Sequence, residues 1–285
     1  MNPVSLNIHL PFSYWLATDP VTGAPLTKPS PRGIALYMRA LERELESLGE
    51  DLREHEIDSV YFAGGYMSLL DSDEFAALMA AVHRSFRLTK DVQIAGTVFP
   101  GSLDMALVSQ YHNYGVGPLM FEIPSLLARE CERLRLPNAL QAMDHTVYLL
   151  QSFRTGGFGL RLPIGLPGRD EGIWKHIFGQ INHYQPMHVA FFDVSGGAAT
   201  EHPAFEETKE ALRALGLREV APLLFTAAKE TPRLALAREF AGVGLGAPSR
   251  LDGFFTKNTG DMGVYLARSG NYRDLLVSVE DLEEG

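Results

Sequence analysis

The sequence predicts an α/β fold: a partial (β/α)6 TIM-like barrel over residues 1–195, followed by a C-terminal α+β extension over residues 196–285 that packs on the barrel. Strand-like and helix-like segments alternate six times, which is typical of a parallel sheet with crossover helices. Six units are too few for the closed eightfold barrel. After Ser195 the alternation gives way to one helix near residues 203–215 and short mixed elements.

The first unit is predicted from a short alternating segment and the loop behind it. Residues Ser5–Leu10 alternate apolar and polar side chains, and the strand ends at Pro11. Residues 13–30 then contain three prolines and no helical periodicity. Such a loop is longer than an ordinary βα connection, so we expect a binding loop or lid that is less ordered than the strands. Ser30 followed by Pro31 predicts the start of the first helix.

The later units rest on the same kinds of signal. Asp71 and Glu74 form a candidate capping box, after which apolar residues recur at helical spacing. Runs of β-branched and aromatic residues bounded by glycine or proline indicate the strands. The predicted strands are residues 59–62, 92–98, 116–123, 157–162 and 188–194, and further helices are predicted near residues 102–112, within 125–152 and around 173–181.

Composition restricts the class of protein. The formal net charge of −10 argues against broad nucleic-acid binding, which needs a basic surface. No apolar run reaches the length of a membrane-spanning helix, and the N-terminus lacks a basic stretch followed by an apolar one. We therefore expect a cytoplasmic protein without a membrane partner. The single cysteine, Cys131, excludes an intrachain disulfide and an all-cysteine metal site, and we expect it to be buried.

The first strand also carries a resemblance to a known family. Asn7-Ile-His-Leu-Pro-Phe-Ser13 resembles the start of the oxygen-independent coproporphyrinogen III oxidases and heme chaperones, a branch of the radical SAM enzymes. In that branch the strand leads into Cys-x3-Cys-x2-Cys, whose thiolates hold a [4Fe–4S] cluster that cleaves S-adenosylmethionine. The resemblance places Ser13, Ala17 and Pro20 at the three cysteine positions. It thus implies a partial barrel of radical SAM type and no iron–sulfur cluster, because none of the three residues offers a thiolate.

Two further segments carry the resemblance along the chain. Gly64 and Gly65 lie where the branch has Gly-Gly-Gly-Thr-Pro-Thr, whose backbone holds the methionyl amine of the cofactor, and Tyr66 follows in place of threonine. Gly165-Leu-Pro-Gly168 matches a turn of the branch, but Arg161 stands where an aspartate would contact the cofactor ribose. These replacements leave the fold intact and argue against unchanged use of S-adenosylmethionine, whose binding stays open.

The same positions give the candidate ligand-binding residues. If the strand parity matches that of the branch, Glu122 and Arg161 face one cavity. They could form a structural ion pair or bind a ligand that carries a carboxylate or phosphate. His9 lies next to the cluster position, although in such a strand a histidine is more often a packed, hydrogen-bonded residue than a catalyst. The full set of candidates is Asn7, His9, Gly64, Gly65, Tyr66, Glu122 and Arg161.

Two other patterns give no site. His176, His183 and His188 suggest metal ligands, but the first two lie two helical turns apart, about 10 Å, so they cannot easily share an ion. Gly242-x-Gly244-x-x-Ala247 has the form of a dinucleotide fingerprint, but Pro248 follows where a helix should begin. A tight turn that closes the mouth of the barrel is the better interpretation.

Two classes of function stay open. In the first, the protein is a cluster-less pseudoenzyme that binds a small molecule or a tetrapyrrole in the barrel cavity, or that supports an intact radical SAM relative or a second copy of itself. In the second, it is a non-radical enzyme that reuses the cavity in a specialised biosynthetic pathway, with S-adenosylmethionine as one candidate ligand. The replaced cofactor contacts favour the first class, and the charged cavity residues and the long loop favour the second. No catalytic residue is assigned.

Overall fold

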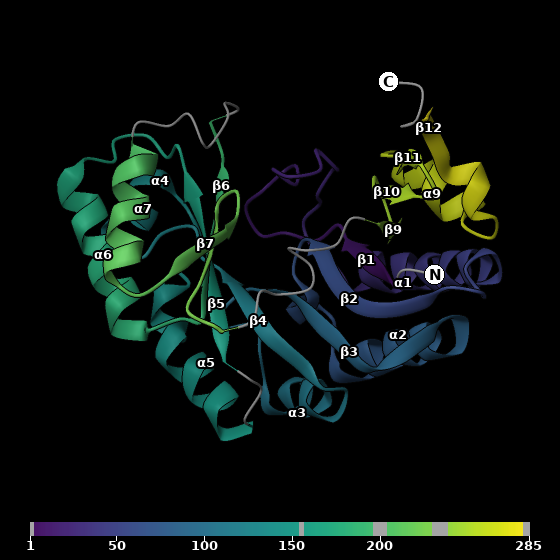
Figure 1. Ribbon diagram of the computed structural model, residues 1–285, viewed down its shortest axis with the longest axis horizontal. Coiled ribbons are helices and arrows are strands. Elements are labelled where there is room, and N and C mark those ends of the chain that lie inside the picture. The colour runs from purple at the N-terminus through teal and green to yellow at the C-terminus, as the bar shows by residue number, and fades with distance from the viewer. Residues whose placement is uncertain (1–2, 154–156, 196–203, 230–238, 282–285) are drawn as a thin grey trace.

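The alternating strands and helices build one curved sheet with helices on its outer side (Figure 1). The computed structural model describes residues 3–153, 157–195, 204–229 and 239–281. Twelve strands lie in the order β12-β11-β10-β9-β1-β2-β3-β4-β5-β6-β8-β7. The seven central strands, from β9 to β6 in this order, run parallel, and the strands at both edges are antiparallel. The predicted α/β fold with a parallel sheet is confirmed.

The elements have the following bounds. The strands are β1 Val4–Leu10, β2 Glu56–Gly64, β3 Arg87–Val98, β4 Val116–Glu122, β5 Phe158–Ile164, β6 His188–Asp193, β7 Arg218–Ala221, β8 Leu224–Thr226, β9 Phe240–Val243, β10 Pro248–Leu251, β11 Phe254–Asn258 and β12 Leu276–Asp281. The α-helices are α1 Pro31–Asp51, α2 Ser72–Ser85, α3 Met105–Asn113, α4 Ala128–Leu134, α5 Leu140–Phe153, α6 Glu171–Tyr184, α7 Ala204–Ala214 and α9 Met262–Arg268. Short 3-10 helices in the described ranges are Met67–Leu69 and Tyr272–Leu275.

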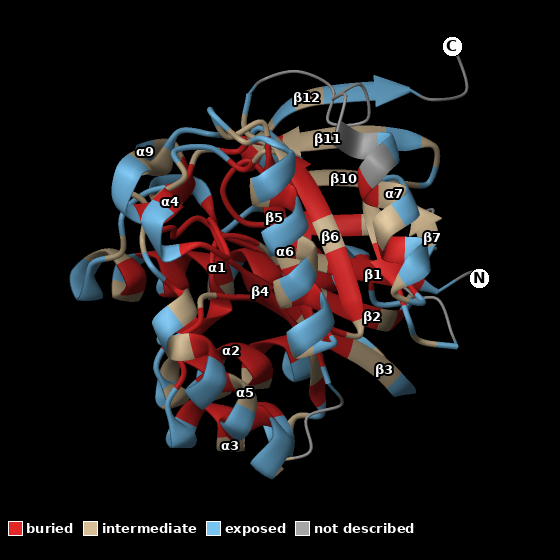
Figure 2. Cartoon of the chain, turned by 90° about the vertical axis from the view of Figure 1, so that its left-hand side faces the viewer, coloured by how far each residue is buried: buried red, intermediate tan, exposed pale blue. Residues whose placement is uncertain are grey.

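Period-two alternation divides each central strand between two environments. In β1, Leu6, Ile8 and Leu10 are fully buried and belong to the core shared with the helices. The alternate residues of β1, including Asn7 and His9, face the inner side of the sheet. Figure 2 shows this layering, with buried strands inside and helices whose outer faces are exposed. The inner face therefore receives the polar side chains that the hydrophobic core cannot hold.

The predicted helix starts are confirmed by their capping contacts. The Ser30 hydroxyl accepts a hydrogen bond from the Gly33 backbone N–H, with Pro31 at the first position of α1. Asp71 and Glu74 form a reciprocal capping box at the start of α2. Such caps stabilise a helix by about 1 kcal/mol each, because they satisfy N–H groups that have no partner within the helix. α1 and α2 thus begin where the sequence predicts.

Several predicted boundaries are wrong. β3 begins at Arg87 rather than near residue 92, and β2 begins at Glu56. Both strands extend into polar residues that show no alternation, so periodicity could not find their starts. Gly242 lies inside β9, where it pairs with Asn7, and the predicted turn begins only after that strand. A glycine is needed there because an added Cβ would meet the carbonyl oxygen of Pro248 at 2.0 Å.

Residues beyond 195 extend the sheet at both edges. The hairpin of β7 and β8 pairs with β6, whereas β9 pairs with β1 and continues through β10, β11 and β12. Within the described ranges, no helix combines the length and the apolar character needed to cross a membrane.

Candidate ligand-binding site

The loop between β1 and α1 lies against the inner face of the sheet (Figure 1). The bridge between Phe12 and Thr27 joins the two ends of the loop. Backbone hydrogen bonds within the loop, such as the one from Asp19 N to Ala24 O at 2.8 Å, stabilise its conformation. The Trp15 side chain of the loop contacts Tyr66, which follows β2, and Phe192 of β6. This arrangement makes the inner face, under the loop, the candidate site.

Glu122 and Arg161 form a buried ion pair at the centre of this face. They are register partners in β4 and β5, and Arg161 Nη1 donates to Glu122 Oε2. The Glu122 side chain is 1% exposed and the Arg161 side chain 12%. Burial raises the pKa of Glu122, an effect that the guanidinium opposes. Burial lowers the pKa of Arg161, but nearby carboxylates raise it by more, so the net shift is upward. The structure therefore brings the two predicted residues together.

Tyr66 connects this ion pair to the loop. Its hydroxyl donates to Glu122 Oε1 at 2.7 Å and accepts from Trp15 Nε1 at 2.8 Å. Burial raises the pKa of Tyr66 well above its ordinary value, so the phenol stays neutral and can donate. On the other side of the pair, the Arg161 guanidinium lies 4.4 Å from the centre of the Phe192 ring. The Trp15 ring also contacts Phe192, with 6.1 Å between ring centroids.

His9 is packed and belongs to a separate contact with the loop. It is 1% exposed, and its Nε2 lies 3.6 Å from Asp19 Oδ2 and 3.5 Å from Thr22 Oγ1. Burial lowers the pKa of His9 despite the neighbouring carboxylate of Asp19. His9 is therefore a neutral residue that holds the loop, as its simpler interpretation predicts.

The other candidates line the same face without charge. Asn7 lies opposite Tyr61 of β2, and its Oδ1 is buried with no hydrogen-bond partner among the described residues. Gly64 has a positive φ of 82°, which favours glycine. At Gly65 an added Cβ would lie 1.9 Å from the carbonyl oxygen of Phe12, so only glycine allows the loop to approach so closely. The structure thus assigns Gly64 and Gly65 a role in packing the loop onto β2.

The three positions aligned with cluster cysteines lie in this loop. The Ser13 hydroxyl accepts hydrogen bonds from the backbone N–H groups of Trp15 and Leu16, at 3.4 and 3.2 Å. Ala17 and Pro20 carry no donor side chain. Cys131 lies buried in α4, where burial raises the pKa of its thiol. Among the described residues, no three His, Cys, Asp or Glu side chains are grouped to hold a metal ion.

A cavity of about 210 Å3 lies on the inner face next to the ion pair. Arg161 lines it together with His188 of β6, which is 4% exposed. His188 Nδ1 is buried and has no hydrogen-bond partner within the described part of the chain. Burial lowers the pKa of His188, so the imidazole is neutral near pH 7. The remaining lining is contributed by Val21, Ser59, Val60, Tyr61, Gln93, Ala95, Gly117, Pro118, Met120, Ala190, Phe191, Pro222, Leu223 and Leu224.

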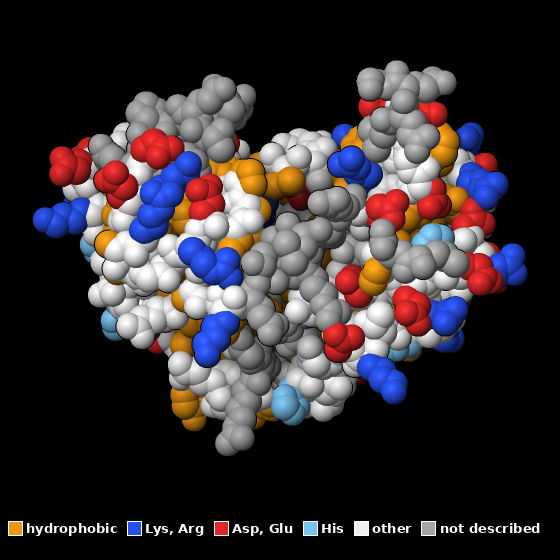
Figure 3. All heavy atoms as spheres, in the orientation of Figure 1, with side chains coloured by type: hydrophobic (Ala, Val, Ile, Leu, Met, Phe, Trp, Pro, Cys, Tyr) orange, Lys and Arg blue, Asp and Glu red, His pale blue; other side chains and the backbone are white. Residues whose placement is uncertain are grey.

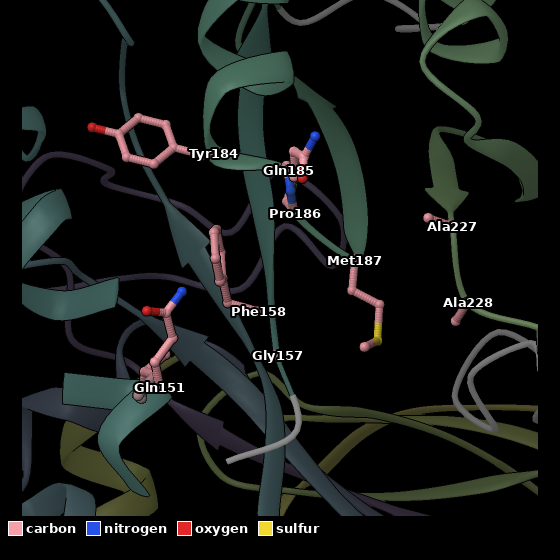
Figure 4. Close-up of a pocket in the computed structure, with 10 residues that line it drawn as sticks. Gln151, Gly157, Phe158, Tyr184, Gln185, Pro186, Met187, Ala227 and Ala228 are labelled. Carbon is pink, nitrogen blue, oxygen red and sulfur yellow. The ribbon is translucent and has the colours of Figure 1, made fainter. Parts of the chain in front are cut away.

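A second cavity, of about 480 Å3, lies at the opposite ends of β5 and β6 (Figure 4). It is formed by the end of α5, the turn between α6 and β6, and the segment after β8. Among the described residues that line it, none carries a full charge. Tyr184 uses its hydroxyl to bind Asp144 at 3.0 Å. This cavity therefore offers fewer groups for recognition than the first.

Sequence reasoning missed Trp15 and the role of His188. Trp15 lies in a loop without periodicity, so no pattern could predict its contact with Tyr66. The sequence suggests His188 only as a metal ligand, whereas the structure shows that it lines the cavity. Its position could have been found, because period-two alternation along 188–194 places it on the same face as Ala190, which lines the cavity with it.

Comparison with known proteins gives partial matches in sequence. No family model matches the chain. The mitochondrial radical S-adenosyl methionine domain-containing protein 1 of Bos taurus is 25% identical over 167 residues, which cover 58% of this chain and 38% of that protein. The oxygen-independent coproporphyrinogen III oxidase of Bradyrhizobium diazoefficiens is 26% identical over 138 residues, which cover 47% and 30%. The chain thus spans between 30% and 38% of the length of these relatives.

A solved structure extends the match over almost the whole chain. The coproporphyrinogen III oxidase HemN of Escherichia coli, a radical SAM enzyme, matches with a TM-score of 0.83 over 98% of this chain and 72% of that chain. Their sequences are 15% identical, so this comparison establishes the shared fold. Together with the curated relatives, this shared fold confirms the predicted resemblance to the radical S-adenosylmethionine superfamily, in the branch of the coproporphyrinogen III oxidases and heme chaperones.

Proposed function

We propose that this protein is a cluster-less member of its branch that binds a small molecule in the 210 Å3 cavity and performs no radical chemistry. The observation that carries the proposal is the cavity itself, which combines an apolar lining with Arg161 and His188. Ligand sites are typically concave and mostly apolar, with a few convergent polar groups that fix the orientation of the ligand.

The donor set supports the absence of a cluster. A [4Fe–4S] cluster needs several thiolates, and the chain has one cysteine. That cysteine is buried in α4 and does not belong to the loop. The Ser13 hydroxyl is already used by two backbone N–H groups of the loop. These residues do not fit the cluster, so no radical step is assigned to this chain.

The size of the cavity supports a small ligand. Its volume of about 210 Å3 lies below the ~300–1,000 Å3 of pockets for drug-sized molecules. A tetrapyrrole, with four rings and several carboxylates, exceeds that size. We therefore propose a single-ring metabolite or a molecule of similar bulk, rather than the substrate after which the relatives are named.

Native mass spectrometry of the purified chain tests this function. We expect the wild type to retain a bound small molecule, and Ala190→Leu to lose it because the larger side chain fills the first cavity. Ala228→Leu is the matched control, since Ala228 lines the second cavity. If Ala190→Leu retains the ligand and Ala228→Leu loses it, the ligand binds in the second cavity and the proposal is wrong. The absence of any bound mass from all three proteins would contradict the proposal.

A non-radical enzyme is the second candidate, and His188 is the observation that favours it. A buried neutral imidazole with an unpartnered nitrogen could accept a proton from a bound molecule. Conversion of the co-purified molecule during incubation, abolished by His188→Leu, would favour this candidate. Addition of S-adenosylmethionine to the same incubation tests whether it takes part.

A further inference from the structure

We propose that the cavity selects an uncharged small molecule, one that carries a carbonyl-type acceptor on a flat apolar frame. This inference rests on the proposed function and names the class of its ligand. It differs from the expectation that Arg161 would recruit a carboxylate or phosphate.

The positive charge of Arg161 is already compensated. Its guanidinium donates to the carboxylate of Glu122, which is 1% exposed and reaches the pair from the neighbouring strand. Asp19 also acts on Arg161, and near His9 the charge of Asp19 is opposed by that of Lys257. A ligand with a net charge would therefore add an uncompensated charge to a mostly apolar cavity, which is costly in a low-dielectric environment.

Arg161 nevertheless retains donors for a ligand. A guanidinium carries five N–H groups, and the hydrogen bond within the described residues uses Nη1. The side chain also lines the cavity and is 12% exposed. A neutral carbonyl oxygen can accept from these N–H groups without disturbing Glu122.

His188 provides the second polar contact. It lines the cavity from β6, and its Nδ1 is buried without a partner among the described residues. A buried polar atom without a partner is rare in proteins and costs stability, so a ligand that pairs with it gains affinity. His188 lies opposite Gly159, two residues before Arg161, so the backbones at the two contacts are separated by roughly 7 Å along the strands.

The walls of the cavity between these two groups are mostly apolar. They include Pro118 and Met120 of β4, Ala190 of β6, Leu223 from the turn before β8 and Leu224 of β8 itself, beside the polar residues Ser59, Tyr61 and Gln93. Such walls suit a ligand with a flat apolar ring rather than a flexible polar ligand. A benzamide-like molecule, with one ring and an amide, has the size, the acceptor and the donor that these groups require.

Three single-ring probes that differ in charge test the inference: benzamide, benzoate and benzylammonium. Binding of each to the wild-type chain is measured by titration calorimetry at pH 7.5. We expect benzamide to bind at least about tenfold more tightly than either charged probe. The free energy lost by burying an unpaired charge is larger than the free energy that corresponds to a tenfold difference in affinity. This comparison needs no variant, so it does not depend on the folding of one.

Variants then locate the contact. His188→Leu should weaken benzamide binding about two- to tenfold, the worth of one hydrogen bond. His176→Leu, on the exposed side of α6, is the matched control and should leave the binding constant unchanged. An equal effect of both variants would overturn the assignment of His188.

The outcomes separate this inference from the function on which it rests. If benzoate binds most tightly, or if the co-purified molecule is anionic, the ligand-binding function stands and the inference fails. If an uncharged molecule co-purifies, the inference is supported even where benzamide itself binds weakly. If no probe binds and no molecule co-purifies, the proposed function fails as well.

Discussion

Glu122 and Arg161 depend on each other because both are buried. Removing one partner of a buried ion pair leaves an uncompensated charge, whereas replacing both partners with uncharged residues leaves no unpaired charge. Tyr66 adds a neutral hydrogen bond to the same carboxylate and so fixes its orientation. The pair therefore stabilises one arrangement of β4, β5 and the loop. The interaction free energy between the two residues can be measured only by changing both of them.

We predict that Arg161→Met lowers the free energy of unfolding by about 3–5 kcal/mol, because Glu122 would stay buried without a cation. The double variant Glu122→Gln/Arg161→Met should lose less than the single variant, since a neutral amide still accepts from Tyr66. Urea denaturation of both variants measures the difference.

An exposed ion pair gives the control for this prediction. Arg87 and Glu56 lie 3.5 Å apart, with side chains 61% and 58% exposed. Arg87→Met should therefore change the free energy of unfolding by about 0–1 kcal/mol. The cycle is completed by the single variant Glu122→Gln. If the losses of Glu122→Gln and Arg161→Met simply add in the double variant, the residues are not coupled and the prediction is wrong.

Strand parity is the reason that this pair could be predicted from sequence. Alternation fixes the face of each strand residue, and register then makes Glu122 and Arg161 neighbours. No such rule applies to Trp15 or Asp19, because a loop has no period and its contacts depend on the surface that it covers. The site could thus be predicted where it is built from strands and not where it is built from the loop.

At the scale of elements, α1 is joined to the C-terminal strands through one buried carboxylate. Glu44 is 1% exposed and accepts hydrogen bonds from the backbone N–H of Gly244 at 2.8 Å, from Asn258 Nδ2 at 2.6 Å and from the Tyr265 hydroxyl at 2.6 Å. These donors come from the segment after β9, from β11 and from α9. One glutamate thus contacts residues 200 or more positions away in the chain.

This carboxylate makes stability depend on pH. Burial raises the pKa of Glu44 from 4.5 to about 7, although its three donors oppose the shift. Below about pH 4.5 the group is protonated in both states. As the pH rises toward 7, the unfolded chain releases the proton first, so the stabilisation is lost over this window. We predict that the wild type loses on the order of 3 kcal/mol more than Glu44→Gln between pH 4.5 and 7.

Urea denaturation at several pH values measures this loss. Glu50→Gln, on the exposed side of the same helix, controls for the removal of one acidic residue. Parallel pH profiles of the wild type and Glu44→Gln would contradict the raised pKa.

The loop between β1 and α1 is the second element with a testable property. Its backbone hydrogen bonds lie mostly within the loop rather than in a strand ladder, and the Trp15 indole N–H binds the Tyr66 hydroxyl. We predict that its amides exchange faster than those of β1, and that Trp15→Phe increases the difference because the indole N–H is lost. Hydrogen exchange followed by mass spectrometry measures both regions in one experiment. Protection of the loop equal to that of β1 would show that packing alone fixes it.

At the scale of the molecule, the part of the sheet whose strands are separated by crossover helices could be predicted from the sequence. Each parallel strand of the first six units is followed by an amphipathic helix, and that alternation is visible in the sequence. The edge strands are short, and tight turns join β7 to β8 and β10 to β11, whereas α9 lies between β11 and β12. Their pairing therefore depends on the edge that they meet. The surface gives no further guide, since acidic and basic side chains are interspersed on the face shown in Figure 3.

The last prediction concerns the relation between this fold and its chemistry. The chain keeps the fold of a radical SAM enzyme, with a TM-score of 0.83 to HemN, and its loop offers serine, alanine and proline where cysteines are expected. After anaerobic reconstitution with iron and sulfide, we expect no cluster, because one thiol cannot replace three. Iron and sulfide analysis with visible absorption spectroscopy measures this, and Cys131→Ser identifies adventitious iron. About four iron atoms per chain with cluster absorption would show that other residues can hold the metal.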